Sequence, residues 1–245
     1  MITDRLRQLR KLMRLLPSGG FRRGLLHGVA ASVEHLGLMR GIAPATLIDV
    51  GANVGQFSLL IRTLHPDVRI YAFEPLSRPA ARFESLFHGD PRTTLRRCAI
   101  GPQTVTGMTM YVSEEDDSSS LLPVSDEQIR FAAGAKTVGT EAVTVARLDE
   151  ILHPADIARP ALLKLDVQGY ELPALQGCGR LLDVVDFVYA EVSFMTLYHG
   201  QALADEVVRF LFANGFSFTA VNNPVFDAAG HCMQADFLFS HRSGA

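Results

Sequence analysis

Residues 46–58 read Thr-Leu-Ile-Asp-Val-Gly-Ala-Asn-Val-Gly-Gln-Phe-Ser. The apolar, largely β-branched run 46–50 predicts a buried strand, and the segment after Gly55 predicts a helix. Between them, Gly51 and Gly55 form a Gly-x-x-x-Gly turn, which lets a ligand approach backbone N–H groups because no Cβ intrudes. A tight turn that needs glycine only for packing shows the same pattern, so this stretch alone leaves both interpretations open.

Beyond this stretch, short apolar runs alternate with helix-length segments, which is typical of a doubly wound α/β sheet. We expect strands at 46–50, 69–73, 94–99, 162–166 and 187–191, and helices near 56–64, 79–87, 172–182 and 202–214. Two further runs, 217–221 and 236–240, are joined by too few residues for a parallel crossover. We expect them to pair antiparallel at the edge of the sheet.

The length of 245 residues and the 48% hydrophobic content fit one α/β domain, expected at 45–245, behind a helical N-terminal extension, 1–44. The net charge of −3 provides no basic field for phosphates, so a nucleic-acid partner is disfavoured. The three cysteines are far apart in the sequence, which predicts reduced thiols. We find no secretory signal and no apolar run long enough to span a membrane, so we expect a cytoplasmic protein.

The start of the chain is basic, because residues 1–40 contain eight Lys and Arg residues against only Asp4 and Glu34. Apolar residues recur at helical spacing from Ile2 to Leu16 among basic ones, which predicts an amphipathic helix, and a second helical stretch is expected from Leu25 to Met39. Such a basic helix packs on its own domain, contacts a second subunit of a homodimer, or lies on an anionic membrane surface. These alternatives stay open.

An insertion at 101–149 contains two alternating stretches, 108–112 and 142–146, around an acidic, serine-rich loop at 114–120. A long polar loop of this kind is either an active-site cover or a solvated connection.

The second predicted strand ends in Glu74, where an acid in this class of fold accepts both hydroxyls of a ribose. A dinucleotide-binding turn would have glycine where Asn53 stands, and Asp49 would face phosphates unfavourably. A nucleoside cofactor without phosphates and with a cationic end fits better, which describes S-adenosylmethionine (SAM). An NAD-dependent oxidoreductase remains the alternative enzyme, and a non-catalytic cofactor-binding partner protein remains the alternative without chemistry.

Six segments in this order resemble the signatures of FkbM-type methyltransferases: 49–58, 73–75, 99–101, 147–149, 164–171 and 234–239. The resemblance implies a class I methyltransferase (Rossmann-like) fold with a seven-stranded sheet, whose last two strands are antiparallel. It also implies SAM as the methyl donor and O-methylation of a hydroxyl, most often on a sugar, glycolipid or polyketide. The expected partner is therefore a small-molecule or saccharide acceptor.

The resemblance also assigns cofactor contacts. Asp49, Gly51, Asn53 and Gly55 would line the methionine and ribose side of SAM, and Glu74 would hold the ribose hydroxyls. Ile100 would lie against the adenine, although an apolar residue at a strand end equally packs in the core without a ligand.

Three residues after the later strands are predicted to carry the chemistry. A hydroxyl attacks a methyl group well only when a base or a metal takes or acidifies its proton, and Asp166, which ends the fourth strand, is the expected base. It could instead cap the following helix or bind the amino group of the cofactor. Glu191 ends the fifth strand and, with Asp166, could bind Mg²⁺ or orient substrate hydroxyls. His199 is a second candidate base or substrate contact, or an exposed loop residue. The family often has Glu where this chain has Gln168, which leaves a base or metal role at that position in doubt.

Overall fold

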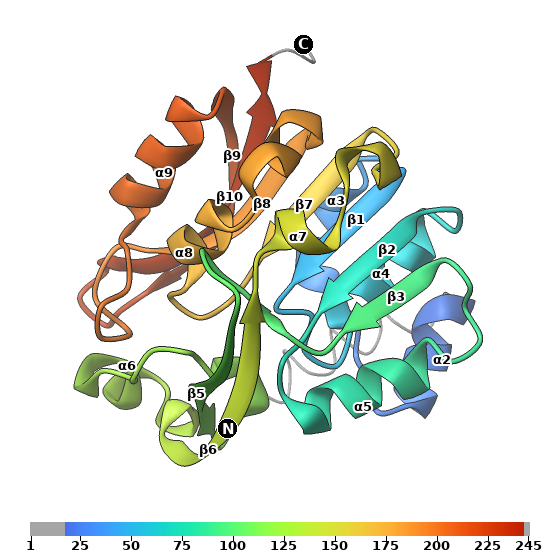
Figure 1. The fold of residues 1–245 in the computed structure, drawn as a ribbon. Coiled ribbons are helices and arrows are strands. Elements are labelled where there is room, and N and C mark those ends of the chain that lie inside the picture. The colour runs from blue at the N-terminus through green and yellow to red at the C-terminus, as the bar shows by residue number, and fades with distance from the viewer. Residues whose placement is uncertain (1–17, 243–245) are drawn as a thin grey trace.

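The computed structural model describes residues 18–242, which form a mixed sheet with helices on both faces (Figure 1). The seven strands lie in the order β3-β2-β1-β7-β8-β10-β9. Their bounds are β1 Thr46–Val50, β2 Arg69–Phe73, β3 Thr93–Arg96, β7 Ala161–Leu165, β8 Phe187–Ser193, β9 Phe216–Phe226 and β10 Cys232–His241. Strands β3, β2, β1, β7 and β8 are parallel, whereas β10 is antiparallel to both neighbours. The expected class I fold and its antiparallel final pair are confirmed.

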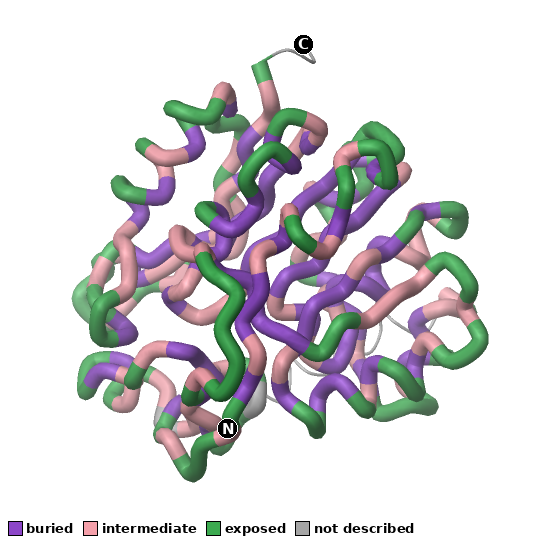
Figure 2. The backbone as a smooth tube through the Cα atoms, in the orientation of Figure 1, coloured by how far each residue is buried: buried purple, intermediate pink, exposed green. Residues whose placement is uncertain are grey.

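Both faces of this sheet are covered, so the central strands β1 and β7 are buried at every position (Figure 2). Leu47 and Ile48 point to opposite faces, and both are fully buried. The helices are α2 Gly19–Leu26, α3 Leu36–Met39, α4 Gln56–Leu64, α5 Ser77–Leu86, α6 Asp126–Phe131, α7 Leu148–Ile151, α8 Glu171–Gln176, the 3-10 helix η5 Gly179–Val184 and α9 Ala204–Ala213. One hydrophobic core lies beneath α2, α4 and α5, and the other lies beneath α8, η5 and α9.

The insertion forms a second, three-stranded sheet in the order β4-β6-β5, with β4 Ala99–Ile100, β5 Val105–Ser113 and β6 Thr137–Ala146. Its alternating stretches lie in β5 and β6, as their period-two pattern indicates, and these strands pair antiparallel. The expected strand 94–99 is wrong in its second half. The chain turns after Arg96, where the N–H of Cys98 bonds back to the carbonyl of Arg96, and residues 99–100 then join the small sheet.

Two predicted helices are broken. The stretch 25–39 is not one helix, because Gly28 adopts a φ of 70° and ends α2, with the N–H of Val29 bonded to the carbonyl of Gly24. An extended segment and the short 3-10 helix η1, Val33–His35, follow before α3. The predicted helix 172–182 divides into α8 and η5 at Gly177 and Gly179, the second of which has a φ of 49°.

The described part of the N-terminal extension belongs to the main core. Phe21, Val33 and Met39 are buried in the cluster that includes Leu60 of α4. The predicted helix 2–16 lies outside the described residues, as do its proposed membrane and subunit contacts. Among residues 18–242, no helix combines the length and hydropathy needed to cross a bilayer.

Strand register places polar side chains side by side on one face of the sheet. Lys164 of β7 lies opposite Asp49 of β1 on one side and Tyr189 of β8 on the other. One step toward the carboxyl edge, Glu191 of β8 lies opposite Asp236 of β10. Because residues two apart on a strand face the same way, these groups share the face that the N-terminal extension covers.

Candidate active site

The turn after β1 is bent so tightly that glycine is required in it. Gly51 has a φ of 77°, and a Cβ there would overlap the carbonyl oxygen of Asp166. Gly55 has a φ of 93° and caps α4, where a Cβ would press on the ring of Phe83. Asn53, between them, also adopts a positive φ, 47°. Packing and backbone geometry therefore require both glycines, and the interpretation of the turn as a ligand site stays a prediction.

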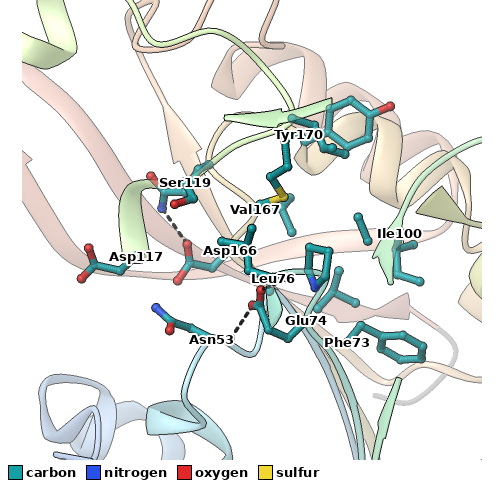
Figure 3. Close-up of a pocket in the computed structure, with 17 residues that line it drawn as sticks. Asn53, Phe73, Glu74, Leu76, Ile100, Asp117, Ser119, Asp166, Val167 and Tyr170 are labelled. Atoms are coloured by element: carbon teal, nitrogen blue, oxygen red, sulfur yellow. Dashed lines mark hydrogen bonds between the residues drawn. The ribbon is translucent and has the colours of Figure 1, made fainter. Parts of the chain in front are cut away.

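A first cavity opens above this turn (Figure 3). Apolar side chains from β2, β4 and β5 form one wall, and Asn53, Glu74, Asp117, Ser119 and Asp166 supply polar groups. No lysine, arginine or histidine among residues 18–242 lines it. A ligand of this cavity meets apolar surface and carboxylates, which suits a flat base, hydroxyls and positive charge better than phosphate.

Glu74 is the most constrained acid in this cavity. It is 5% exposed, and its two carboxyl oxygens accept the backbone N–H groups of Asn53 and Leu76, each at 2.9 Å. Burial raises the pKa of Glu74 to about 7, although these hydrogen bonds and Lys164 act in the opposite direction. Each oxygen keeps a lone pair for a further donor, as contact with two adjacent hydroxyls requires.

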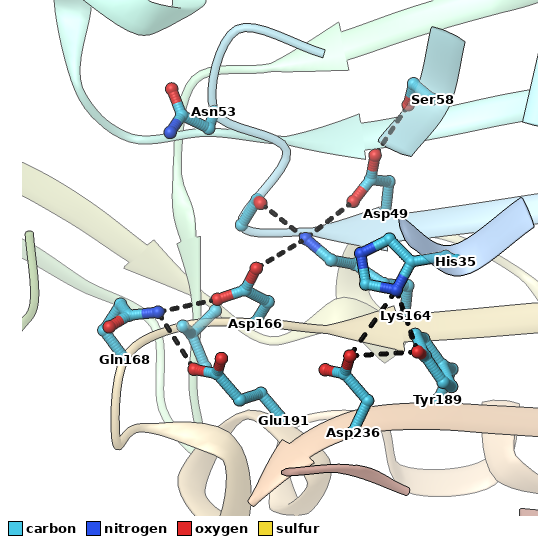
Figure 4. Close-up of polar contacts among 12 residues, drawn as sticks. His35, Asp49, Asn53, Ser58, Lys164, Asp166, Gln168, Tyr189, Glu191 and Asp236 are labelled. Carbon is cyan, nitrogen blue, oxygen red and sulfur yellow. Dashed lines mark hydrogen bonds and ion pairs between the residues drawn. The ribbon is translucent and has the colours of Figure 1, made fainter. Parts of the chain in front are cut away.

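Lys164 of β7 connects the turn after β1 with β1 and with the end of β7 (Figure 4). Its Nζ donates to the carbonyl of Gly51 at 2.8 Å and lies 3.3 Å from Asp49 Oδ1 and 3.5 Å from Asp166 Oδ2. Burial alone would lower the pKa of Lys164, but Asp49 and Asp166 outweigh it and raise the pKa, so the ammonium keeps its charge. Asp49 is fully buried and also accepts a hydrogen bond from Ser58 Oγ at 2.6 Å.

Gln168 holds the two later acids together. Its Nε2 donates to Asp166 Oδ1 at 2.8 Å and to Glu191 Oε2 at 3.0 Å, and the hydroxyl of Tyr198 lies 2.7 Å from its Oε1. Gln234 donates to the other oxygen of Glu191 at 2.7 Å. Burial, followed by repulsion from Asp166, raises the pKa of Glu191 well above its ordinary value.

A second cavity adjoins the first on the face covered by the N-terminal extension. Both cavities are lined by Gly51, Asn53, Asp117 and Asp166, so they meet beside the turn. The second is rich in carboxylates and amides, with Glu34, His35, Lys164, Tyr189, Glu191, Asn223, Gln234 and Asp236 among its lining residues. The two cavities are therefore continuous beside the turn, and the second offers mainly polar groups.

The Methyltransferase FkbM domain profile matches residues 49–218. The chain belongs to the FkbM methyltransferase family. It is 27% identical over 203 residues to the 31-O-demethyl-FK506 methyltransferase FkbM of Streptomyces tacrolimicus, covering 74% of this chain and 75% of that one. It is 31% identical over 150 residues to the hexuronic acid methyltransferase AglP of Haloferax volcanii, covering 60% of this chain and 55% of that one.

Among solved structures, an FkbM methyltransferase from Methylobacillus flagellatus KT superposes with a TM-score of 0.54 at 14% identity. The match covers 88% of this chain and 49% of that one, and it supports the fold alone. The chain therefore spans between about half and three quarters of the length of these relatives.

The residues predicted for the site divide among the first cavity, the second cavity and positions outside both. Glu74 and Ile100 line the first cavity, Glu191 lines the second, and both cavities are lined by Gly51, Asn53 and Asp166. Asp49 and Gly55 lie behind the turn and line neither cavity. His199 is exposed, and its backbone N–H bonds to the carbonyl of Pro123 at 2.8 Å.

Several residues of the candidate site were not predicted from the sequence. Tyr198, the neighbour of His199, lies against Gln168, and His35, Tyr189 and Asp236 line the second cavity. Lys164 and Tyr189 could have been found, because a lysine in an otherwise apolar strand and a tyrosine two residues before Glu191 share the face of the predicted acids. No sequence signal connects His35 with them.

Asp166 and Glu191 do not fit a Mg²⁺ site. A donor group, the Nε2 of Gln168, bridges their carboxyl oxygens, so a cation between them would face an N–H group. Among residues 18–242, no group of three or more His, Cys, Asp or Glu side chains is placed to hold a metal.

Replacing Lys164 tests its role as the support of the turn. Lys164→Met leaves the buried Asp49 carboxylate without its cation, so we expect the free energy of unfolding to fall by about 3–5 kcal/mol. Adding Asp49→Asn removes the stranded charge and should restore more than half of the loss. Urea denaturation measures both changes, and equal stability of the single and double variants would contradict this role.

Glu171 allows a test of burial. It lies in the first turn of α8, fully buried, and accepts the N–H groups of Val167 and Gly169, yet burial raises its pKa to about 7. Because its pKa is higher in the folded chain than the ordinary 4.5, its contribution to stability is present below pH 4.5 and is lost as the pH rises to about 7.

The variant Glu171→Gln keeps the acceptor oxygen without the titration. It should match the wild type near pH 4 and exceed its stability by up to about 3 kcal/mol at pH 8. Urea denaturation at the two pH values measures the difference, and a difference independent of pH would contradict the raised pKa.

Proposed function

We propose that this chain is a SAM-dependent O-methyltransferase that acts on a hydroxyl group of a saccharide or related small molecule. The observation that carries the proposal is the junction of the two cavities at Asp166, where a methyl donor and an acceptor would meet. Bound in the first cavity, SAM supplies a methyl group on a positively charged sulfur.

The first cavity supports SAM rather than NAD. Glu74 would accept the ribose hydroxyls, and Ile100 with Phe73 would contact the adenine. Asp117 and Asp166 would face the cationic end of the cofactor. A pyrophosphate would meet these same carboxylates with no basic side chain from residues 18–242 to offset them.

The second cavity supports a polyhydroxyl acceptor. Its carboxylates and amides offer many hydrogen bonds to hydroxyl groups, and the name of the archaeal relative specifies a hexuronic acid. Asp166 would accept a hydrogen bond from the reacting hydroxyl and orient it toward the first cavity, while Gln168 and Lys164 fix the carboxylate. Asp49 would act indirectly, through Lys164.

Calorimetric titration with S-adenosylhomocysteine tests the donor. We expect binding in the micromolar range at pH 8 and at least about tenfold weaker binding by Glu74→Gln, because the loss of one good charged hydrogen bond has this effect. Glu84→Gln, an exposed acid of α5 paired with Arg97, is the matched control and should bind normally. Binding of NAD⁺ in place of S-adenosylhomocysteine would overturn the proposal.

Transfer of a tritiated methyl group from SAM to a panel of methyl glycosides of neutral hexoses, deoxyhexoses and hexuronic acids tests the acceptor. We expect transfer to at least one glycoside, equal rates with Mg²⁺ and with EDTA, and about 100-fold slower transfer by Asp166→Asn with unchanged S-adenosylhomocysteine affinity. Loss of transfer in EDTA would contradict the metal-independent site, and full activity of Asp166→Asn would exclude its role.

A further inference from the structure

Asp236 of β10 reaches the second cavity from the hairpin of β9 and β10. It lies opposite Glu191 of β8 in the antiparallel pair, and its side chain is 13% exposed. Unlike Asp166, it does not line the first cavity, so it belongs to the part of the second cavity beyond the junction. A ligand that contacts both Asp166 and Asp236 therefore extends from the junction into the second cavity.

One carboxyl oxygen of Asp236 is held by the protein. Its Oδ2 accepts a hydrogen bond from the Tyr189 hydroxyl at 3.0 Å and another from the Asn223 amide at 2.8 Å. Two donors on one oxygen fix the direction of the carboxyl group. Burial raises the pKa of Asp236 to about 6, so the group is a carboxylate at pH 8.

The other oxygen of Asp236, Oδ1, has no hydrogen-bond partner among residues 18–242 and is open to the cavity. Figure 4 shows it turned toward the side of Glu191 and Asp166. Both oxygens of Glu191, by contrast, accept amide hydrogens. The oxygens of Asp166 contact Gln168 and Lys164. Asp236 thus offers the second cavity a charged acceptor that is fixed in direction and that the described part of the chain leaves open.

We propose that Asp236 determines acceptor specificity by accepting a hydrogen bond from a second hydroxyl of the acceptor, while Asp166 orients the hydroxyl that receives the methyl group. This inference rests on the proposed methyl transfer. The acceptor class is then a molecule with at least two free hydroxyls, such as a sugar ring, rather than an isolated alcohol. The second hydroxyl donates, so an ether or a fluorine in its place loses the contact, and a carboxylate in its place is repelled.

The variant Asp236→Asn removes this acceptor and keeps the shape of the side chain. Because Tyr189 and Asn223 both donate to the Oδ2 position, the carbonyl oxygen of the asparagine should take that position. Its N–H group then faces the cavity in place of Oδ1. Asp205→Asn, which changes an exposed acid of α9 paired with Arg209, is the matched control.

Monodeoxyfluoro analogues of the best glycoside of the panel, one for each hydroxyl, test the contact, because fluorine is close in size to a hydroxyl but carries no proton. The analogue that receives no methyl group identifies the reacting hydroxyl. At one other position we expect fluorine to raise the wild-type KM by about tenfold or more with kcat nearly unchanged, as the loss of a charged hydrogen bond does. The same analogue should raise the KM of Asp236→Asn by less than about threefold, because the contact is already lost.

Two further results belong to the expected outcome. Asp205→Asn should show the wild-type penalty, and S-adenosylhomocysteine affinity should be the same in all three proteins, which shows that the first cavity is intact. An equal penalty in the wild type and in Asp236→Asn would overturn the role of Asp236 and leave the methyl transfer standing. So would a wild type in which no second position raises KM, a result that needs no variant. Failure of the wild type to bind S-adenosylhomocysteine or to methylate any glycoside would instead overturn the proposed function, and this inference with it.

Discussion

The buried charge of Lys164 is the constraint on which the site depends. An ammonium in the interior is stable only when carboxylates and carbonyls surround it, and here they come from two neighbouring strands and the turn between strand and helix. The Lys164 ammonium also donates to the carbonyl of Gly51, so the group that pairs with Asp166 fixes the backbone of the turn after β1 as well. Loss of this charge would loosen the turn and the carboxylate together.

Strand register explains why so many polar groups meet at one place. Because β7 pairs in parallel with β1 and β8, Lys164 lies between Asp49 of β1 and Tyr189 of β8. The antiparallel β10 then places Asp236 beside Glu191. These side chains would be an unfavourable polar patch on an ordinary sheet face. The N-terminal extension covers this face, and its His35 packs against Phe57 of α4. Between the extension and the polar side chains lies the second cavity, in place of a close-packed core.

The sequence predicted the parts of the structure that follow from local pattern. The strand and turn at 46–58, the position of Glu74 at the end of β2 and the antiparallel final pair all agree with the structure, because alternation, glycine and strand length act over a few residues. Predictions failed where distant contacts decide. Arg96 ends its strand because the next residues join another sheet.

The sequence predicted the acids of the candidate site and several residues of the first cavity, including Gly51 and Asn53, but not the side chains that connect the acids. Asp166 and Glu191 follow buried strands and so stand at the carboxyl edge, but the amide of Gln168 between them depends on a backbone φ of 53° that no spacing reveals. His35 is 154 residues from Tyr189 in sequence, and only the folded chain brings them together. Asp49 resembles a ligand contact in sequence, yet its side chain is directed to Lys164 beneath the turn.

A crystal structure of the chain with S-adenosylhomocysteine would test most directly whether the two cavities divide the work of donor and acceptor. The adenosine should occupy the first cavity, with both ribose hydroxyls on Glu74 and the sulfur facing the second cavity beside Asp166. A nucleoside bound in the second cavity, or a sulfur directed away from Asp166, would contradict this arrangement.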